Sequence, residues 1–154
     1  MLTKNKVLTW LQEHPIATIA TLSTDHTPQM AVVYTYVDKD YYCYFVTKEQ
    51  TRKYYNLYKN KTISVAWFDE QGLITCEMNG EAHIVHEGEG VAVAVTYLQE
   101  AMINQKAEYW TPPVGQVEGT KYAVFRILPY QVSYTDYSSA TKRNPKPKRL
   151  AFQP

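Results

Sequence analysis

The segment 45–53 carries the residues best suited to chemistry. An aromatic and β-branched run ends at Thr47, a short polar turn follows, and Thr51, Arg52 and Lys53 then open a stretch with helical spacing. Free backbone N–H groups and the positive end of the helix dipole gather at such a helix start, so this position favours an anion. Arg52 offers a planar fork of donors and Lys53 a compact charge, which together suit a terminal phosphate. The spacing predicts a phosphate-binding turn, with two solvated surface cations as the alternative.

Other reactive residue types lack the spacing that their chemistry needs. His83 and His86 have opposite parity on a strand and no third ligand nearby, so we expect no metal site. No Gly-x-Ser-x-Gly, Gly-x-Gly-x-x-Gly or Walker sequence occurs, which argues against hydrolysis and against those modes of nucleotide binding. Cys43 and Cys76 each lie inside an apolar stretch, and we expect two buried free thiols.

The elements that must position this turn indicate an antiparallel meander with short helices. Residues 73–85 give the clearest strand signal, because apolar and polar residues alternate along them. Pro15 ends the first helix and Pro129 the last strand. We expect helices at 3–14, 51–59 and 87–102, and strands at 16–22, 29–37, 41–47, 62–68, 73–85 and 122–128. This order has no βαβ rhythm, so a closed or nearly closed antiparallel barrel fits it best.

Length and charge indicate one domain followed by a basic arm. The chain has 154 residues, about the length of one domain. Five cations stand together near its end: Lys142, Arg143, Lys146, Lys148 and Arg149. Without them the body has 11 basic against 15 acidic residues, which argues against a nucleic-acid-binding face. We therefore expect a domain at 1–137 and an extended or disordered arm at 138–154.

The location of the protein follows from what the chain lacks. No apolar run approaches the roughly 20 residues of a membrane-spanning helix, and the first residues turn amphipathic without an apolar signal segment. Two cysteines in apolar stretches do not indicate a disulfide framework. We expect a cytoplasmic protein with no membrane partner.

The order of these segments resembles the pyridoxamine 5'-phosphate oxidase-like family of FMN-binding split barrels, over about residues 4–137. The most specific motif is Thr-x3-Thr-Arg-Lys at 47–53. Around it come IATIATL (16–22), PQMAVVY (28–34), YFVT (44–47), TISVA (62–66), GEA (80–82), FRILP (125–129) and VSY (132–134). The resemblance implies a mainly β (α+β) fold: a six-stranded antiparallel Greek-key split barrel with flanking short helices.

The resemblance also implies a homodimer that holds FMN at the subunit interface. In the family, the strand that matches 29–34 lies along the isoalloxazine, which assigns Gln29, Val32, Val33 and Tyr34 to the cofactor. Thr47, Thr51, Arg52 and Lys53 match the positions that hold the phosphate and the ribityl chain. Thr75 falls near a position at which the partner subunit approaches the flavin.

Two departures from the family pattern separate this chain from the pyridoxamine phosphate oxidases proper. Those enzymes carry an arginine where Gln29 stands and a lysine near Tyr34. Each loss would cost about 1–3 kcal/mol of cofactor affinity if nothing replaced it. The tryptophan and arginine of their C-terminal substrate segment also have no clear counterpart here, so another substrate is expected.

The leading interpretation is an FMN-dependent oxidoreductase that transfers hydride to or from a small organic substrate, with NAD(P)H as a candidate electron donor. We assign no catalytic acid or base. The alternatives are a non-catalytic FMN- or haem-binding module with a stress or sensing role, and an empty split barrel that only dimerises. Tyr34, Trp67 and Trp110 are candidates for stacking on a planar ligand, although packing alone would also explain them.

Overall fold

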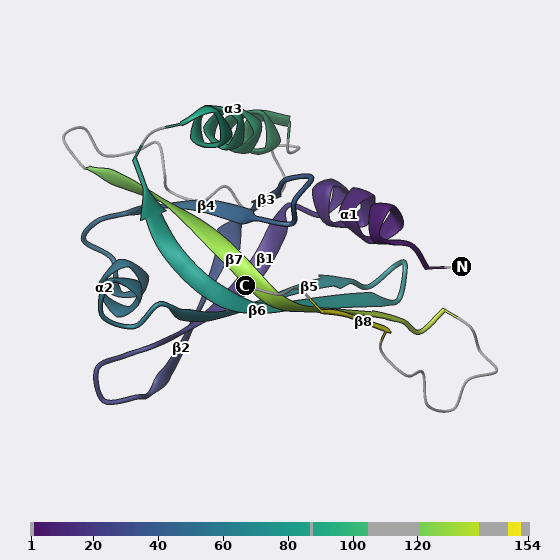
Figure 1. The fold of residues 1–154 in the computed structure, drawn as a ribbon, viewed down its shortest axis with the longest axis horizontal. Helices are drawn as coiled ribbons and strands as arrows, with labels where there is room; N and C mark the ends of the chain where they lie inside the picture. Colours follow the sequence, from purple (N-terminus) through teal and green to yellow (C-terminus); the bar gives the residue numbers. More distant parts are fainter. Residues whose placement is uncertain (1, 87, 105–120, 139–147, 152–154) are drawn as a thin grey trace.

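The computed structural model describes residues 2–86, 88–104, 121–138 and 148–151 (Figure 1). The helices are α1 (Lys4–Glu13), α2 (Arg52–Lys59) and α3 (Glu89–Asn104). The strands are β1 (Ile16–Leu22), β2 (Pro28–Tyr34), β3 (Tyr36–Val37), β4 (Cys43–Lys48), β5 (Thr62–Asp69), β6 (Ile74–Val85), β7 (Tyr122–Asp136) and β8 (Lys148–Ala151).

The strands form one antiparallel sheet that curves into a split barrel. Its order is β2-β1-β5-β6-β7-β4-β3, and β8 is added alongside β7. β6 and β7, with 12 and 15 residues, cross the whole molecule and bend with the sheet (Figure 1). The expected fold class is confirmed, although the described residues make eight strands rather than six.

The two extra strands have separate origins: one divides from the second expected strand, and the other forms within the expected arm. The expected strand 29–37 divides at Thr35, whose backbone N–H and hydroxyl both donate to the Pro15 carbonyl, at 2.6 and 3.0 Å. The short strand β3 therefore leaves β2 and pairs with β4 instead. Within the expected arm at 138–154, residues 148–151 form β8 against β7, while residues 139–147 and 152–154 lie outside the described part.

The last expected strand was predicted to end at Pro129, and this was wrong. β7 continues to Asp136, because Pro129 falls where the β6–β7 register shifts between Asn79 and Gly80. A Cβ atom on Gly80 would lie 2.3 Å from the Leu128 carbonyl oxygen, so glycine permits this close approach of the strands. The proline thus occupies an irregularity of the ladder, one of the few places in a sheet that tolerates it.

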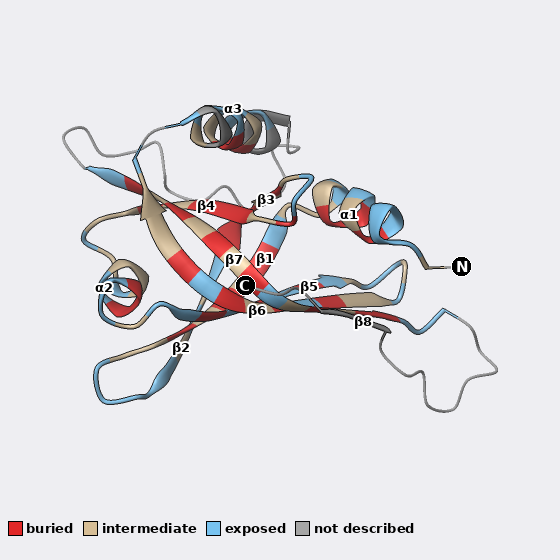
Figure 2. Cartoon of the chain, viewed as in Figure 1, coloured by how far each residue is buried: buried red, intermediate tan, exposed pale blue. Residues whose placement is uncertain are grey.

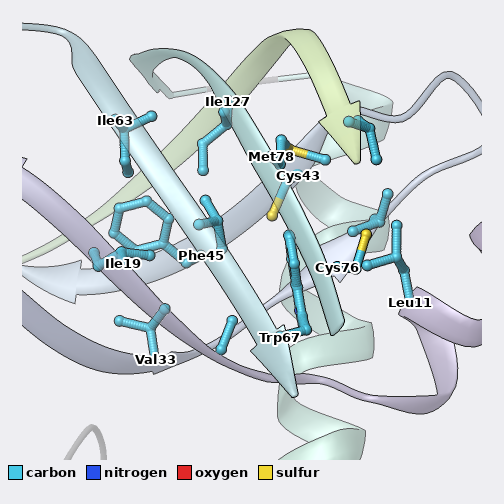
Figure 3. Packing of buried hydrophobic residues seen from close by; sticks show 14 of the residues in the cluster. Leu11, Ile19, Val33, Cys43, Phe45, Ile63, Trp67, Cys76, Met78 and Ile127 are labelled. Atoms are coloured by element: carbon cyan, nitrogen blue, oxygen red, sulfur yellow. The ribbon is translucent and has the colours of Figure 1, made fainter. Parts of the chain in front are cut away.

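The core fills the inside of the barrel with aromatic and aliphatic side chains from the seven strands β1 to β7. Trp67, Phe45, Met78 and Ile127 are each at most 1% exposed and point toward one another in Figure 3. Val7, Trp10 and Leu11 of α1 close one end of this cluster. Cys43 and Cys76 belong to the same cluster as free thiols, which confirms the prediction made from the sequence.

The helices cover the barrel at separate places. α1 and α3 lie on the same side of Figure 1, whereas α2 lies apart from them near the hairpin of β1 and β2. Thr3 caps α1 and Thr51 caps α2, each accepting from a backbone N–H three residues later. Within the described residues, no helix is both long and apolar enough to cross a membrane.

Candidate anion-binding site

A cap built from two threonines shapes the turn between β4 and α2. The Thr51 hydroxyl donates to the Lys48 carbonyl at 2.9 Å and accepts from the Tyr54 backbone N–H at 3.4 Å. Thr47 Oγ1 lies 2.9 Å from Thr51 Oγ1. Because the Thr51 hydrogen is directed to Lys48, Thr47 is the donor of this pair. Thr47 is buried behind the cap, so it braces Thr51 from within.

Two adjacent cations open α2 where its dipole is positive. Arg52 is exposed, Lys53 is half-buried, and the first turn of α2 contains no acidic residue. Burial lowers the pKa of Lys53 below its usual value, and the neighbouring Arg52 charge lowers it further. The positive end of the helix dipole disfavours cations at a helix N-terminus, and two adjacent cations also repel each other. An anion placed between them would relieve both effects.

These cations border a cavity of about 270 Å³ between α2 and the first hairpin. β1 and β2 supply the opposite wall. The lining residues are Thr21, Gln29, Met30, Ala31, Thr51, Arg52 and Lys53. None of these carries a negative charge. Among the described strands, β2 pairs only with β1, so its other side is an open sheet edge.

A buried amide connects the floor of this cavity to α2. Asn56, 7% exposed, donates from Nδ2 to Thr21 Oγ1 at 2.9 Å and to Gln29 Oε1 at 3.0 Å. The register of the hairpin places Thr21 opposite Gln29, which brings both acceptors within reach of one helix residue. Asn56 therefore fixes the distance between α2 and the hairpin.

The structure gathers four of the sequence-predicted cofactor residues at this cavity. Gln29, Thr51, Arg52 and Lys53 line it, and Thr47 supports it from behind. Val33 and Tyr34 are buried at the end of β2, and burial raises the pKa of Tyr34. Val32 and Thr75 lie elsewhere, on the outer face of the sheet.

Sequence reasoning missed Thr21, Met30, Ala31 and Asn56. One feature could have pointed to Asn56: it is a polar residue next to Leu57, and both are buried on the side of α2 that faces the barrel. Of the candidate stacking residues, Tyr34 and Trp67 are buried in the fold, and Trp110 lies outside the described residues. His83 pairs with Glu81 at 3.3 Å, and the described residues contain no group of three or more His, Cys, Asp or Glu side chains placed to hold a metal ion.

The outer face of β2, β1 and β5 exposes apolar side chains, of which Met30 lies at the cavity. Met30 is 75% exposed, Val32 46% and Phe68 66%. The register aligns Val32 with Thr18, and Thr18 with Ala66, so small and apolar residues continue across three strands. Thr75 shares this face through its pairing with Phe68, at the end of the strands remote from the cavity. Figure 2 shows exposed segments along β2 and its hairpin. Exposed apolar side chains gathered on one face are typical of interaction surfaces.

The chain belongs to the pyridoxamine 5'-phosphate oxidase family, whose sequence model matches residues 3–136. No curated protein matches it significantly. Its fold is similar to that of a pyridoxamine 5'-phosphate oxidase-related, FMN binding protein from Nostoc punctiforme, with 11% identity, 100% of both chains covered and a TM-score of 0.62.

Two further solved structures share this fold. General Stress Protein 26 from Bacillus anthracis is 18% identical, with 97% of this chain and 98% of that chain covered and a TM-score of 0.66. A heme binding protein from Mycobacterium smegmatis is 16% identical, with 95% of this chain and 56% of that chain covered and a TM-score of 0.68. The family and the fold are thus established, and relatives of this fold include both flavin and haem binders.

Proposed function

We propose that this protein binds FMN through its phosphate at the start of α2 and acts as an FMN-dependent oxidoreductase on a small organic substrate. The observation that carries the proposal is the pair Arg52 and Lys53, which borders a cavity without acidic side chains at the positive end of a helix. Arg52 would hold two phosphate oxygens with its planar fork, and Lys53 would contribute a point charge. Membership in the family and an FMN binding structural relative support this choice of anion.

The dimensions of the cavity fit part of the cofactor. Its volume of about 270 Å³ lies just below the range of about 300–1,000 Å³ in which drug-sized ligands are enclosed. The phosphate and the start of the ribityl chain would fill it, and the ring system would extend along the open edge of β2. The apolar outer face with Met30 and Val32 would then be covered by a second subunit. A homodimer with FMN at its interface is therefore part of the proposal.

Bound FMN would supply the hydride chemistry, and the residues of this chain would supply binding and orientation. Gln29, Thr51, Arg52 and Lys53 would hold the phosphate, while Val32 and, from the partner subunit, Thr75 would approach the flavin. None of these residues needs to act as an acid or base. NAD(P)H is the proposed electron donor.

Haem binding is the second candidate, favoured by the likeness to the heme binding protein. The cations would suit the propionates of haem as well as a phosphate. Of the lining residues, however, only Met30 belongs to the side-chain types that ligate haem iron, since the lining holds no His, Cys or Tyr. The cavity therefore favours FMN.

Absorption spectra and a charge-matched pair of variants test the proposal. The purified protein should show a flavin spectrum and bind FMN, and it should form dimers in light scattering. Arg52→Ala with Lys53→Ala should weaken FMN binding at least about 100-fold, because two charge-assisted hydrogen bonds are lost. Lys59→Ala with Lys61→Ala removes two charges outside the cavity and should bind FMN normally. Equal affinities for the two double variants would refute the phosphate assignment.

Two further measurements distinguish an enzyme from a passive flavin binder and from a haem binder. Bleaching of the flavin by NADPH or NADH, followed by reoxidation with an organic acceptor, would distinguish an enzyme from a passive binder. A Soret band after addition of haem, with no change on addition of FMN, would favour the haem-binding alternative.

A further inference from the structure

The orientation of the Gln29 side chain is determined by Asn56. An amide NH₂ group has two hydrogens, and Asn56 uses both, toward Thr21 Oγ1 at 2.9 Å and Gln29 Oε1 at 3.0 Å. Thr21 can accept because its own hydroxyl hydrogen is directed at the Gln29 backbone carbonyl, at 3.5 Å. The oxygen end of the Gln29 amide is therefore the end turned toward α2.

The opposite end of the same amide is left for an occupant of the cavity. Gln29 lines the cavity, and within the described part of the chain no hydrogen bond from its Nε2 is found. If the amide were reversed, its NH₂ group would face the NH₂ group of Asn56, and two donors would repel. The reversed orientation would also turn the carbonyl oxygen of the Gln29 amide, the negative end of its dipole, toward any bound anion.

We propose that Asn56 is a positioning residue, which holds Gln29 so that its Nε2 group donates a hydrogen bond to the phosphate in the cavity. This inference rests on the proposed function in one respect only, that the cavity takes a phosphate group. It assigns a role to a residue that does not touch the ligand. It also explains how a neutral glutamine serves at a position where a cation would otherwise be expected: its donor is aimed and cannot rotate away.

The first test measures the contribution of the phosphate separately from that of the flavin ring. The ratio of the riboflavin Kd to the FMN Kd isolates this contribution, because the two ligands differ only in the phosphate. Asn56→Ala should lower the ratio about tenfold, the lower end of the range for a hydrogen bond to a charged group. In a Gln29→Met background, where no donor remains to be positioned, Asn56→Ala should lower it no further.

The second test follows the Gln29 amide directly by NMR. Addition of inorganic phosphate to the wild-type protein should shift the Nε2 signals, which are assigned by their loss in Gln29→Met. The shift should diminish in Asn56→Ala. If that variant does not fold, Asn56→Asp keeps the size of the side chain while replacing its donors with acceptors, and it should also lower the Kd ratio.

Four results would overturn the inference: three concern Asn56 and Gln29, and the fourth is a failure to bind either phosphate or FMN. Equal weakening of FMN and riboflavin by Asn56→Ala would reveal a merely structural role, as would the same fall of the ratio in the Gln29→Met background. Gln29 signals that do not respond to phosphate would do the same. A protein that binds inorganic phosphate with the expected Gln29 shift but not FMN would refute the proposed function and support the inference. A protein that binds neither would refute both.

Discussion

Trp67 donates a hydrogen bond from its indole Nε1 to Thr35 Oγ1 across 3.1 Å, and both residues are 1% exposed. The Thr35 hydroxyl in turn donates to the Pro15 carbonyl at 3.0 Å. The largest fully buried side chain is thus hydrogen-bonded to the link that separates β2 from β3. This contact secures the inner end of β2, the strand that forms one wall of the candidate site.

Thr35→Val should destabilise the protein by about 1–3 kcal/mol, because it leaves a buried indole N–H without a partner. Thr35→Ser keeps the hydroxyl and is the matched control, with a smaller loss expected. Urea unfolding followed by tryptophan fluorescence measures both. A valine variant as stable as the serine variant would show that the hydrogen bond contributes nothing net.

Gly80→Ala should be costly because the new Cβ would meet backbone. The Leu128 carbonyl oxygen would lie 2.3 Å from that atom, so β6 and β7 must separate. We expect a loss of about 3 kcal/mol, the upper part of the usual range for overpacking. Gly72→Ala provides the comparison, since the atoms nearest to its Cβ would belong to side chains, those of Asp69 and Ile74, which can shift. In thermal unfolding, Gly80→Ala should have a much lower Tm than Gly72→Ala. A higher Tm for Gly80→Ala would contradict the strand geometry.

Local signals in the sequence predicted most of the fold. The cap of α2 depends on Thr51 and its immediate neighbours, and the strand at 74–85 depends on an alternation that any sheet would require. The end of β7 was mispredicted because Pro129 is accommodated by Gly80, which is far from it in sequence. Pairing of this kind is decided by tertiary register rather than by local preference.

The candidate site likewise has residues that local sequence predicted and residues that it did not. The cations and Thr51 are adjacent in the chain, so their spacing alone indicated an anion site. Asn56 reaches Thr21 and Gln29 across 35 and 27 positions of sequence, and no local pattern predicts that meeting. The exposure of Met30 and Val32 was likewise not predicted, because the alternation of a strand does not tell which of its two faces stays exposed.

Asp69→Asn should remove a contribution to stability that depends on pH. A hydrogen bond from the Gly72 backbone is the main cause that lowers the pKa of Asp69 below its usual 3.8, and His14, whose Nε2 lies 3.4 Å from Oδ2, lowers it further. A carboxyl group with a lowered folded pKa stabilises the protein above pH 3.8, and this contribution is lost as the pH falls through the folded value. The difference in unfolding free energy between wild type and Asp69→Asn should therefore be constant near neutrality and shrink below about pH 4. A difference that grew on acidification would have the wrong sign.

The contribution of the phosphate to FMN affinity should begin to weaken at a lower pH than it would with a lysine of ordinary pKa. Burial, together with Arg52, lowers the pKa of Lys53 below 10.5, so in the free protein this side chain loses its charge before a solvated lysine does. The phosphate is a dianion throughout this range, since its second pKa is about 6. The ratio of the riboflavin Kd to the FMN Kd should accordingly begin to fall below pH 10.5 in the wild type. In Lys53→Arg the ratio should hold to higher pH, because a guanidinium keeps its proton. Titration of both ligands from neutral to alkaline pH measures this, and identical profiles for the two proteins would exclude Lys53 from the phosphate site.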